Sequence, residues 1–237
     1  MTRPLQLAVI GHGKMGRAVA ALAAERGMSV VTTIDADANA DGKGITRQSL
    51  AGADVAVEFT APAAALPNIL ATVAAGCPIV VGTTGWYDAL ATATERVKAG
   101  GGALLYAPNF SVGVNLFLQM AAQAARLVMR APGFDVHVTE VHHAAKKDAP
   151  SGTAIAVQEA VREASGRQAP ISSIRVGYVP GTHEVLFDAP FEQLRLEHVA
   201  RDRRVFAEGA LLAAQWLVGK QGVFTMRDVL SSSMEST

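Results

Sequence analysis

Short apolar runs alternate with amphipathic stretches through the first half of the chain. Runs of strand length begin at residues 5, 29, 54, 78 and 103, and helical spacing follows several of them, as at 62–75 and 88–98. Strands that alternate with helices predict an α/β fold with a parallel, doubly wound sheet, whose ligands bind at the carboxyl ends of the strands. Residues 36–52 are polar and contain several glycines, so they are expected to form a connection.

The pattern changes beyond residue 110. A helix expected over 112–130 is apolar nearly all round, which predicts that it is buried between layers. Residues 135–142 then alternate, and a helix is expected over 151–164. Three strand-like runs follow, at 171–176, 182–188 and 191–198. They predict a smaller, mostly antiparallel sheet covered on one face by helices. Open sheets of this kind often associate through the other face, so a homo-oligomer is expected.

A last apolar stretch, residues 206–220, predicts a helix that ends near Gly222 and packs back on the first half of the chain. The first domain is therefore expected to comprise residues 1–110 and 205–237. The second domain, residues 111–204, is expected to bind the substrate and to carry the contacts of the oligomer.

The first strand passes directly into the turn Gly11-His-Gly-Lys-Met-Gly16, which opens a helical pattern. In a G-x-G-x-x-G turn the first glycine makes the bend, the second lets the backbone approach a pyrophosphate, and the third lets helix and strand pack closely. The motif alone is weak, but it stands here between a strand and a helix, as the dinucleotide-binding function requires. The first domain is thus predicted to bind a dinucleotide.

The second strand ends in Asp35, which lies 19 positions beyond Gly16. A carboxylate at that strand end can accept hydrogen bonds from an adenosine ribose. The following Ala36-Asp-Ala38 offers no arginine for a 2′-phosphate, which favours NADH, although Lys14 or Lys43 could neutralise the extra phosphate of NADPH. A surface aspartate without this role is the alternative.

The densest group of reactive side chains lies at residues 140–154. Two carboxylates, two imidazoles and two ammonium groups fall within it: Glu140, Asp148, His142, His143, Lys146 and Lys147. Ser151 is expected to cap the helix that follows, so that the N–H groups of Gly152 and Thr153 point outward and bind a carboxylate. The segment therefore predicts an anion-binding turn beside an acid.

Two other interpretations of this segment stay open. A His-His pair followed by Lys-Lys also occurs in solvated loops without function. A metal site is less favoured, because adjacent histidines project to opposite faces of a strand and the neighbouring lysines would repel a cation. No bound metal is therefore expected.

Composition narrows the classes of function. The 237 residues include 21 basic and 21 acidic side chains, so bulk charge predicts neither a nucleic-acid partner nor a membrane surface. Cys77 is the single cysteine, which excludes an internal disulfide, and its apolar neighbours predict a buried side chain rather than a nucleophile. No stretch approaches the ~18 uninterrupted apolar residues of a membrane span, and a cytoplasmic setting is expected.

Taken together, the motifs resemble the dihydrodipicolinate reductase family, the 4-hydroxy-tetrahydrodipicolinate reductases of bacterial and plant lysine biosynthesis. The signature E-x-H-H-x-x-K-x-D-A-P-S-G-T is highly specific to this family, whereas the glycine turn is shared by many enzymes. The resemblance spans nearly the whole chain, through Gly11-His-Gly-Lys-Met-Gly16, Val81-Gly-Thr-Thr-Gly85, Pro108-Asn-Phe-Ser-Val-Gly-Val-Asn115, residues 140–153, Arg203-Arg-Val-Phe-Ala-Glu-Gly-Ala210 and Met226-Arg-Asp-Val-Leu230.

The resemblance implies an NAD(P)H-dependent reductase that forms tetrahydrodipicolinate in the diaminopimelate route, with a Rossmann domain, a mixed-sheet domain and a homotetrameric assembly. It implies that His142 and Lys146 are the acid/base pair, and that His143, Gly152 and Thr153 contact the dicarboxylate substrate. The implied cofactor contacts are Gly11, His12, Gly13, Lys14, Met15, Gly16, Asp35, Gly82, Thr83, Thr84, Ala107, Pro108, Asn109 and Phe110.

The chain departs from the family pattern in two places. Lys14 and Asp35-Ala36 stand where many members carry an arginine and an acidic-basic pair, which weakens the case for NADPH. The connection between Gly177 and Gly181 is also short for the family.

Two rival functions remain. An amino-acid dehydrogenase of related fold, such as an aspartate dehydrogenase, is disfavoured by the paired-His, Lys and Ser-Gly-Thr motif. A redox-sensing regulator without catalysis would need a DNA-binding module or a basic patch, and the sequence shows neither.

Overall fold

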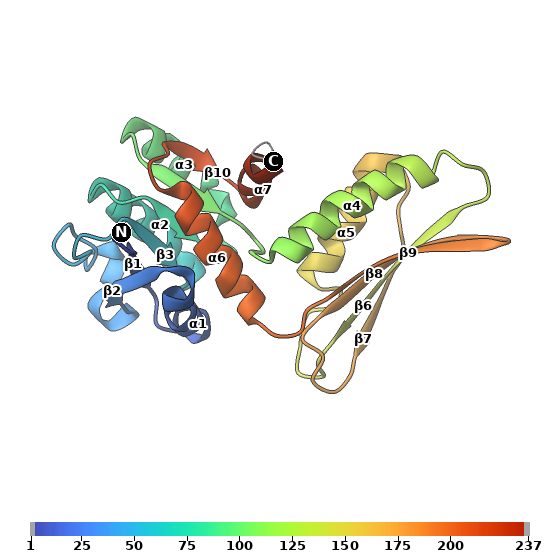
Figure 1. Ribbon diagram of the computed structural model, residues 1–237, viewed down its shortest axis with the longest axis horizontal. Coiled ribbons are helices and arrows are strands. Elements are labelled where there is room, and N and C mark those ends of the chain that lie inside the picture. Colours follow the sequence, from blue (N-terminus) through green and yellow to red (C-terminus); the bar gives the residue numbers. More distant parts are fainter. Residues whose placement is uncertain (1–2, 235–237) are drawn as a thin grey trace. The chain divides into compact units, whose positions relative to one another are not determined.

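The computed structural model describes residues 3–234, and side chains as far as residue 231. The chain divides into two compact units (Figure 1). Unit 1 comprises the residues up to Ser111 and those from Arg204 onward, and unit 2 is the uninterrupted segment Val112–Arg203. The chain therefore leaves unit 1 once and returns to it once.

Unit 1 is built on a six-stranded sheet with the strand order β10-β5-β4-β3-β1-β2. Every pairing in this sheet is parallel. The strands are β1 (Leu5–Ile10), β2 (Met28–Ile34), β3 (Val55–Glu58), β4 (Ile79–Val81), β5 (Ala103–Tyr106) and β10 (Gly222–Phe224). The central strands β1, β3 and β4 are apolar except for Gln6 and Glu58 and are largely buried, as expected for a sheet covered on both faces.

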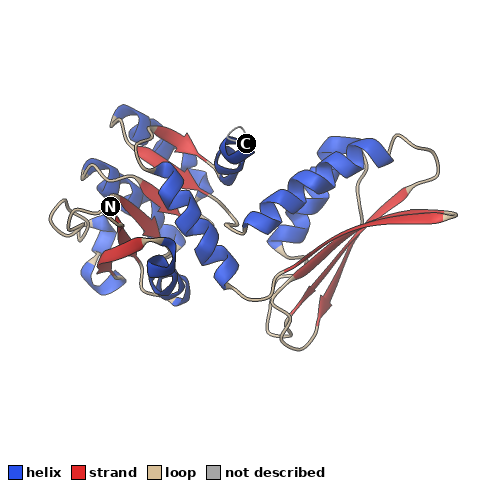
Figure 2. Ribbon diagram, in the orientation of Figure 1, coloured by secondary structure: helices blue, strands red, loops and turns tan. Residues whose placement is uncertain are grey.

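Helix α1 packs with α6, and α2 packs with α3, beside this sheet. Figure 2 shows the helices in blue and the strands in red. The helices of unit 1 are α1 (Lys14–Ala23), α2 (Pro62–Ala74), α3 (Leu90–Ala99), α6 (Arg204–Leu217) and α7 (Met226–Met234). Short 3-10 turns occupy Ala24–Arg26, Ala36–Ala38, Ala40–Gly42 and Tyr87–Ala89. The doubly wound parallel sheet expected from the sequence is confirmed, and the segment after β2 is a connection as predicted.

The end of the chain differs from the prediction of a single helix that ends near Gly222. Helix α6 ends at Leu217, and Gly219 follows with a φ of 78°, a left-handed conformation that terminates a helix. Residues Gly222–Phe224 then form β10, which pairs with β5, and α7 follows it. The prediction was wrong because a three-residue strand is too short to show a periodicity of its own.

Unit 2 contains a four-stranded mixed sheet with the order β7-β6-β8-β9. Strand β6 pairs with β7 in parallel, whereas β6 with β8 and β8 with β9 are antiparallel. The elements are α4 (Val112–Val128), β6 (Asp135–His142), α5 (Gly152–Ser165), β7 (Ile171–Arg175), β8 (Thr182–Ala189) and β9 (Glu192–Val199). Helices α4 and α5 pack together over one face, where Phe117, Val138 and Phe187 lie in the core. The predicted α+β sheet is thus confirmed.

Helix α4 is not buried all round, contrary to the prediction. Its inner side buries Val114, Phe117, Ala121 and Ala125, whereas Leu116, Met120 and Leu127 are 39%, 52% and 58% exposed. Apolar composition on every side of the helix concealed which side faces the sheet.

Cys77 is buried as predicted, and burial raises the pKa of its thiol to about 12, which makes it a poor nucleophile.

Among residues 3–234, none of the helices combines the length and the apolar character that crossing a bilayer demands.

Candidate functional site

The glycine turn of unit 1 lies at the carboxyl end of β1, and two of its three glycines leave no room for a side chain. Gly11 has a φ of 92°, and a Cβ there would lie 2.2 Å from the carbonyl oxygen of Phe59. A Cβ on Gly16 would lie 1.9 Å from the carbonyl oxygen of Gly11. Close packing of strand, turn and helix therefore explains both glycines.

Gly13 differs from its two neighbours, because it faces open space. Within the described part of the chain, no atom lies within 4 Å of a Cβ built on this residue, and no side chain caps α1. The first N–H groups of α1 thus have the arrangement that binds a phosphate group at a helix N-terminus. His12 and Lys14 are exposed beside it, and the guanidinium of Arg17 donates to the carbonyl oxygen of His12 at 2.9 Å. These residues fit a dinucleotide pyrophosphate.

Asp35 is exposed at the end of β2 and adjoins the glycine turn. Its Oδ1 accepts hydrogen bonds from the backbone N–H of His12 at 3.1 Å and of Ala36 at 2.9 Å. The hydrogen bond from His12, followed by that from Ala36, lowers the pKa of the carboxyl group. Asp35 is therefore a carboxylate at neutral pH, and its other oxygen, Oδ2, can accept hydrogen bonds from a ribose.

A buried polar network links the ends of β3 and β4. Glu58 is fully buried, and its Oε1 accepts hydrogen bonds from Thr60, from Thr83 Oγ1 at 3.0 Å and from Asn68 Nδ2 at 3.3 Å. Thr83 in turn accepts from the N–H of Thr60 at 2.7 Å. The predicted cofactor contact Thr83 thus uses its hydroxyl inside the protein, and Glu58 was not identified from the sequence. Burial raises the pKa of Glu58.

The remaining predicted cofactor contacts share the same sheet edge but differ in exposure. Thr84 and Pro108 are exposed, Met15, Gly82 and Asn109 are half-buried, and Ala107 and Phe110 are buried. The ring of Phe110 lies 6.1 Å from that of Phe59, which also excludes a side chain at Gly82.

In unit 2, the reactive segment begins where β6 ends. His142 is the last residue of β6 and is 8% exposed, whereas His143 projects from the turn that follows. The Nε2 atom of His143 lies 3.2 Å from Nη2 of Arg203, and Lys146 pairs with both carboxylate oxygens of Asp148 at 2.8 Å. Ser151 caps α5 as predicted, since its hydroxyl accepts from the N–H of Ala154 at 3.2 Å.

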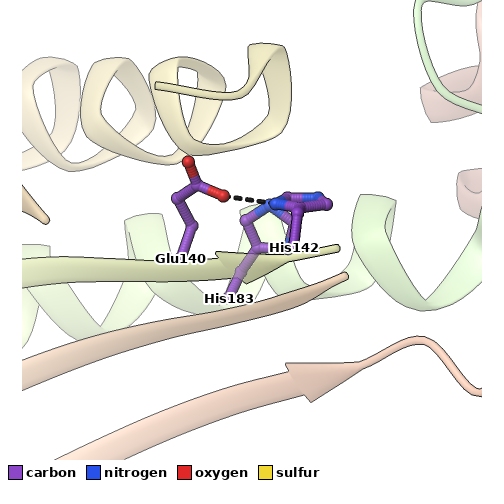
Figure 3. Close-up of side chains that lie close together, drawn as sticks. All are labelled: Glu140, His142 and His183. Atoms are coloured by element: carbon purple, nitrogen blue, oxygen red, sulfur yellow. Dashed lines mark hydrogen bonds and ion pairs between the residues drawn. The ribbon is translucent and has the colours of Figure 1, made fainter. Parts of the chain in front are cut away.

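Glu140 connects several parts of this segment (Figure 3). Its side chain is fully buried on the same face of β6 as His142, and its Oε2 pairs with Nδ1 of His142. Its Oε1 accepts from Nη2 of Arg175 at 2.6 Å and from the N–H of Ser151 at 3.3 Å. The same guanidinium nitrogen donates to the carbonyl oxygen of Asp148 at 2.6 Å. One carboxylate thus joins β6, β7 and the start of α5.

His183 on β8 completes the cluster drawn in Figure 3. Its ring meets that of His142 edge-to-face at 5.1 Å, and its Nε2 lies 3.2 Å from the hydroxyl of Ser151. Sequence reasoning missed His183, although the alternation of β8 places it on the same face as Val185 and Phe187 and thus marked it as inward-facing. Arg175 was missed as well.

The protonation states in this cluster follow from burial and neighbouring charges. Burial alone would raise the pKa of Glu140, but hydrogen bonds from Arg175, Ser173 and His142 lower it to about 2. Burial lowers the pKa of His142 against the opposing effect of Glu140. Burial, with a smaller effect from His142, lowers the pKa of His183 to about 4. At neutral pH the cluster therefore holds one carboxylate and two neutral imidazoles.

Glu140, His142 and His183 also offer three potential metal-ligating atoms within 4.8 Å of one another. The carboxylate is already paired with the guanidinium of Arg175, and Lys146 adds a second positive charge nearby. These cations oppose the binding of a metal ion in this cluster.

The predicted residues thus form two sets, one in each unit. Comparison with known proteins bears on both sets. The family model for the N-terminus of dihydrodipicolinate reductase matches residues 5–110, and that for the C-terminus matches residues 113–230.

Relatives and solved structures agree with this match. A 4-hydroxy-tetrahydrodipicolinate reductase from Christiangramia forsetii is 35% identical over 96% of this chain and 98% of its own length. A dipicolinate-bound dihydrodipicolinate reductase from Paenisporosarcina sp. TG-14 has a TM-score of 0.79 at 22% identity and covers 94% of this chain and 97% of its own. An aspartate dehydrogenase from Thermotoga maritima shares the fold at a TM-score of 0.51 and 10% identity, covering 91% of this chain and 97% of its own.

Proposed function

The chain belongs to the dihydrodipicolinate reductase family, and we propose from this membership that it reduces 4-hydroxy-tetrahydrodipicolinate to tetrahydrodipicolinate. The 4-hydroxyl group leaves as water to give dihydrodipicolinate, which then takes up a hydride and a proton. The reaction belongs to the diaminopimelate route of lysine biosynthesis. The observation that carries the proposal is the Glu140–His142 pair beside the serine-capped start of α5, because it combines proton transfer with carboxylate binding in one cluster. An aspartate dehydrogenase is less well supported, since its likeness to this chain is one of fold alone.

A reduced nicotinamide, when bound, supplies the hydride. The glycine turn and the N-terminus of α1 would hold the pyrophosphate, and Asp35 would accept hydrogen bonds from the adenosine ribose. The strand ends around Gly82, Thr84 and Asn109 would hold the other half of the cofactor. This proposal is supported by the open backbone at Gly13 and by the ionised carboxylate of Asp35.

The substrate of this reaction is a dianion, and the solved relative named above has dipicolinate bound. We propose that Lys146, His143 and the N–H groups of Gly152 and Thr153 hold the two carboxylates of the substrate. The arrangement of a helix start beside an ammonium group suits this role, because both present positive charge to an anion. Lys146 must then exchange part of its contact with Asp148 for the substrate.

His142 is the proposed proton donor. It is neutral before substrate binds, since burial lowers its pKa, and a bound dianion raises that pKa again. His142 can thus take up a proton with the substrate and deliver it after hydride transfer. A positioned acid of this kind contributes about 10²–10⁴-fold in rate.

The function is tested by a steady-state assay with enzymatically generated substrate, in which the loss of reduced nicotinamide is followed for NADH and NADPH separately. We expect turnover with both coenzymes and a preference for NADH. The same preparation is offered L-aspartate with oxidised coenzyme. Oxidation of L-aspartate without reduction of the dicarboxylate would replace this proposal with the rival function.

The preference for NADH rests on the charge of Asp35, which would repel a 2′-phosphate. No arginine follows Asp35 in the turn Ala36–Ala38. The positive charges of Arg17, Lys14 and Lys43 could offset part of the repulsion between Asp35 and a 2′-phosphate. We therefore propose a preference rather than exclusive use.

We further propose a homotetramer in the cytoplasm. The face of the unit 2 sheet opposite α4 and α5 carries Ile174 and Val199, which are 46% and 54% exposed, and Val176, 51% exposed, lies just beyond the end of β7. Apolar side chains on an open sheet face favour association with a second copy. Light scattering after size-exclusion chromatography measures the assembly, and a monomer at micromolar concentration would contradict it.

A further inference from the structure

We propose that Glu140 is a positioning residue, which holds His142 in one tautomer and at a set distance from the carboxylate-binding start of α5. The inference rests on the proposed function, in which His142 handles the proton and α5 binds the substrate. It adds a role for a fully buried side chain that acts through His142.

The carboxylate of Glu140 lies between His142 and the start of α5. Residues two apart on a strand project to the same face, so Glu140 and His142 lie side by side in the core of unit 2 (Figure 3). One oxygen of Glu140 pairs with Nδ1 of His142, and the other accepts the N–H of Ser151 at 3.3 Å. A single planar group therefore links the imidazole to the residue that caps α5.

The pairing with Glu140 fixes which ring nitrogen of neutral His142 carries the proton. A carboxylate can only accept hydrogen bonds, so pairing with Glu140 places the ring proton of neutral His142 on Nδ1. The other nitrogen, Nε2, is then the atom that can take up and deliver a proton. A Cβ on Gly181 would lie 3.0 Å from this Nε2, so the glycine keeps space beside it.

The negative charge of Glu140 is balanced by the guanidinium of Arg175. The carboxylate of Glu140 must stay ionised in the core. Arg175 stabilises the charge by donating a hydrogen bond of 2.6 Å to Oε1, the oxygen that also accepts the N–H of Ser151. Because this nitrogen of Arg175 also binds the carbonyl oxygen of Asp148, it fixes the loop that carries Lys146. The contacts of Glu140 and Arg175 thus extend from His142 to the loop that carries Lys146 and to the start of α5. Both of these are proposed to bind the carboxylates of the substrate.

The charged and titratable groups around His142 come from each element packed against it. They are Glu140 on β6, Lys146 on the loop, Arg175 on β7 and His183 on β8, and Asp148 pairs with Lys146. His183 is neutral, and its Nε2 lies within hydrogen-bond distance of the hydroxyl of Ser151 rather than of Glu140. Glu140 is accordingly the group that raises the proton affinity of His142, while Lys146 and Arg175 oppose it.

The test compares Glu140→Gln with the wild type. Glutamine keeps the shape of the side chain but loses the charge and can offer an NH₂ group to Nδ1. We expect turnover to fall at least about 10–100-fold, the range found for groups that orient a metal-bound histidine. The limb of the pH–turnover profile that reports protonated His142 should move to lower pH, while the KM for the coenzyme stays unchanged. Glu159→Gln is the control, because Glu159 pairs with Arg162 on the exposed side of α5.

A second measurement needs no variant. Nitrogen chemical shifts of the His142 ring in the wild type should show a protonated Nδ1 and an unprotonated Nε2 at neutral pH. The opposite tautomer overturns the proposal, and so does a Glu140→Gln enzyme with wild-type turnover and an unmoved pH profile. If the variant does not fold, the tautomer measurement decides. If the wild type fails to reduce the substrate, the proposed function fails, whereas the tautomer still reports on the pairing itself.

Discussion

The Nδ1 atom of His142 pairs with the carboxylate of Glu140, two residues earlier on the same strand. The pair is buried, and the guanidinium of Arg175 approaches the carboxylate from the neighbouring strand. The imidazole proposed to transfer the proton is thus supported from inside the protein, while the loop and helix that follow the strand carry the groups proposed to bind the substrate.

Replacing His142 with glutamine should remove the proposed proton donor while keeping a side chain that can hydrogen-bond to Glu140. Turnover should fall about 10²–10⁴-fold, with little change in coenzyme affinity. Stopped-flow measurement of turnover and fluorescence titration of the coenzyme check both parts. His137→Gln is the control, because His137 lies on the same strand and its Nε2 bonds to Ser172 at 2.9 Å on the exposed side. Equal activity of the two variants would exclude His142 as the donor.

Replacing Lys146 with alanine should weaken substrate binding. Loss of a charged hydrogen bond to a carboxylate costs about 1.5–3 kcal/mol, so the KM for the substrate should rise roughly 10–100-fold. Lys147→Ala tests the specificity of the effect, since Lys147 is exposed and adjacent. The assignment of Lys146 would be wrong if both variants had the same KM as the wild type.

Replacing Asp35 with alanine should shift coenzyme use towards NADPH, because the charge that repels a 2′-phosphate is removed. We expect the ratio of kcat/KM for NADPH to that for NADH to rise roughly tenfold, equivalent to about 1.4 kcal/mol. Asp37→Ala should leave the ratio unchanged, since Asp37 is exposed in the turn beyond it. An unchanged ratio in Asp35→Ala would remove Asp35 from the cofactor site.

The buried Glu58 should make stability depend on pH. Burial raises its pKa in the folded chain above the ordinary value of 4.5, so the folded state binds a proton more tightly than the unfolded state. Stability from this group is therefore present below pH 4.5 and is lost as pH rises through the pKa of the folded state. Glu58→Gln should remove this dependence, as measured by urea unfolding across the same pH range.

Removing the hydrogen-bonding groups of Glu58 altogether tests the network around it. Glu58→Ala would leave Thr60, Thr83 and Asn68 without their shared acceptor and should cost about 1–3 kcal/mol at all pH values. Glu95→Gln serves as the control, because Glu95 is exposed on α3. If the stability of Glu58→Gln still changed with pH as that of the wild type does, the pH dependence would come from a group other than Glu58.

Much of the fold and part of the site could be predicted from the sequence, because the signals are local. The glycine turn at Gly11, the cap at Ser151 and the alternation of β6 each depend on a few consecutive residues. Buried strands and turn glycines have steric requirements that are visible without knowledge of their neighbours.

The contacts of Glu140 could not be predicted in this way. Arg175 lies 35 residues further along the chain and reaches Glu140 only because β6 and β7 pair in parallel, with His142 opposite Arg175. His183 reaches His142 through the antiparallel register of β6 and β8, in which Glu140 faces His183. Such long-range register has no signature in one sequence, and neither does the three-residue strand β10.

The interruption of unit 1 by unit 2 has a consequence for biosynthesis. The ribosome makes the whole of Val112–Arg203 before it makes α6 and β10, so the first 111 residues emerge without the helix that packs on β3, β4 and β5 and without an edge strand. Unit 2 is contiguous and can complete its core as soon as it leaves the exit tunnel. Unit 1 would then be finished last, and chaperones would be most needed while its sheet is still incomplete.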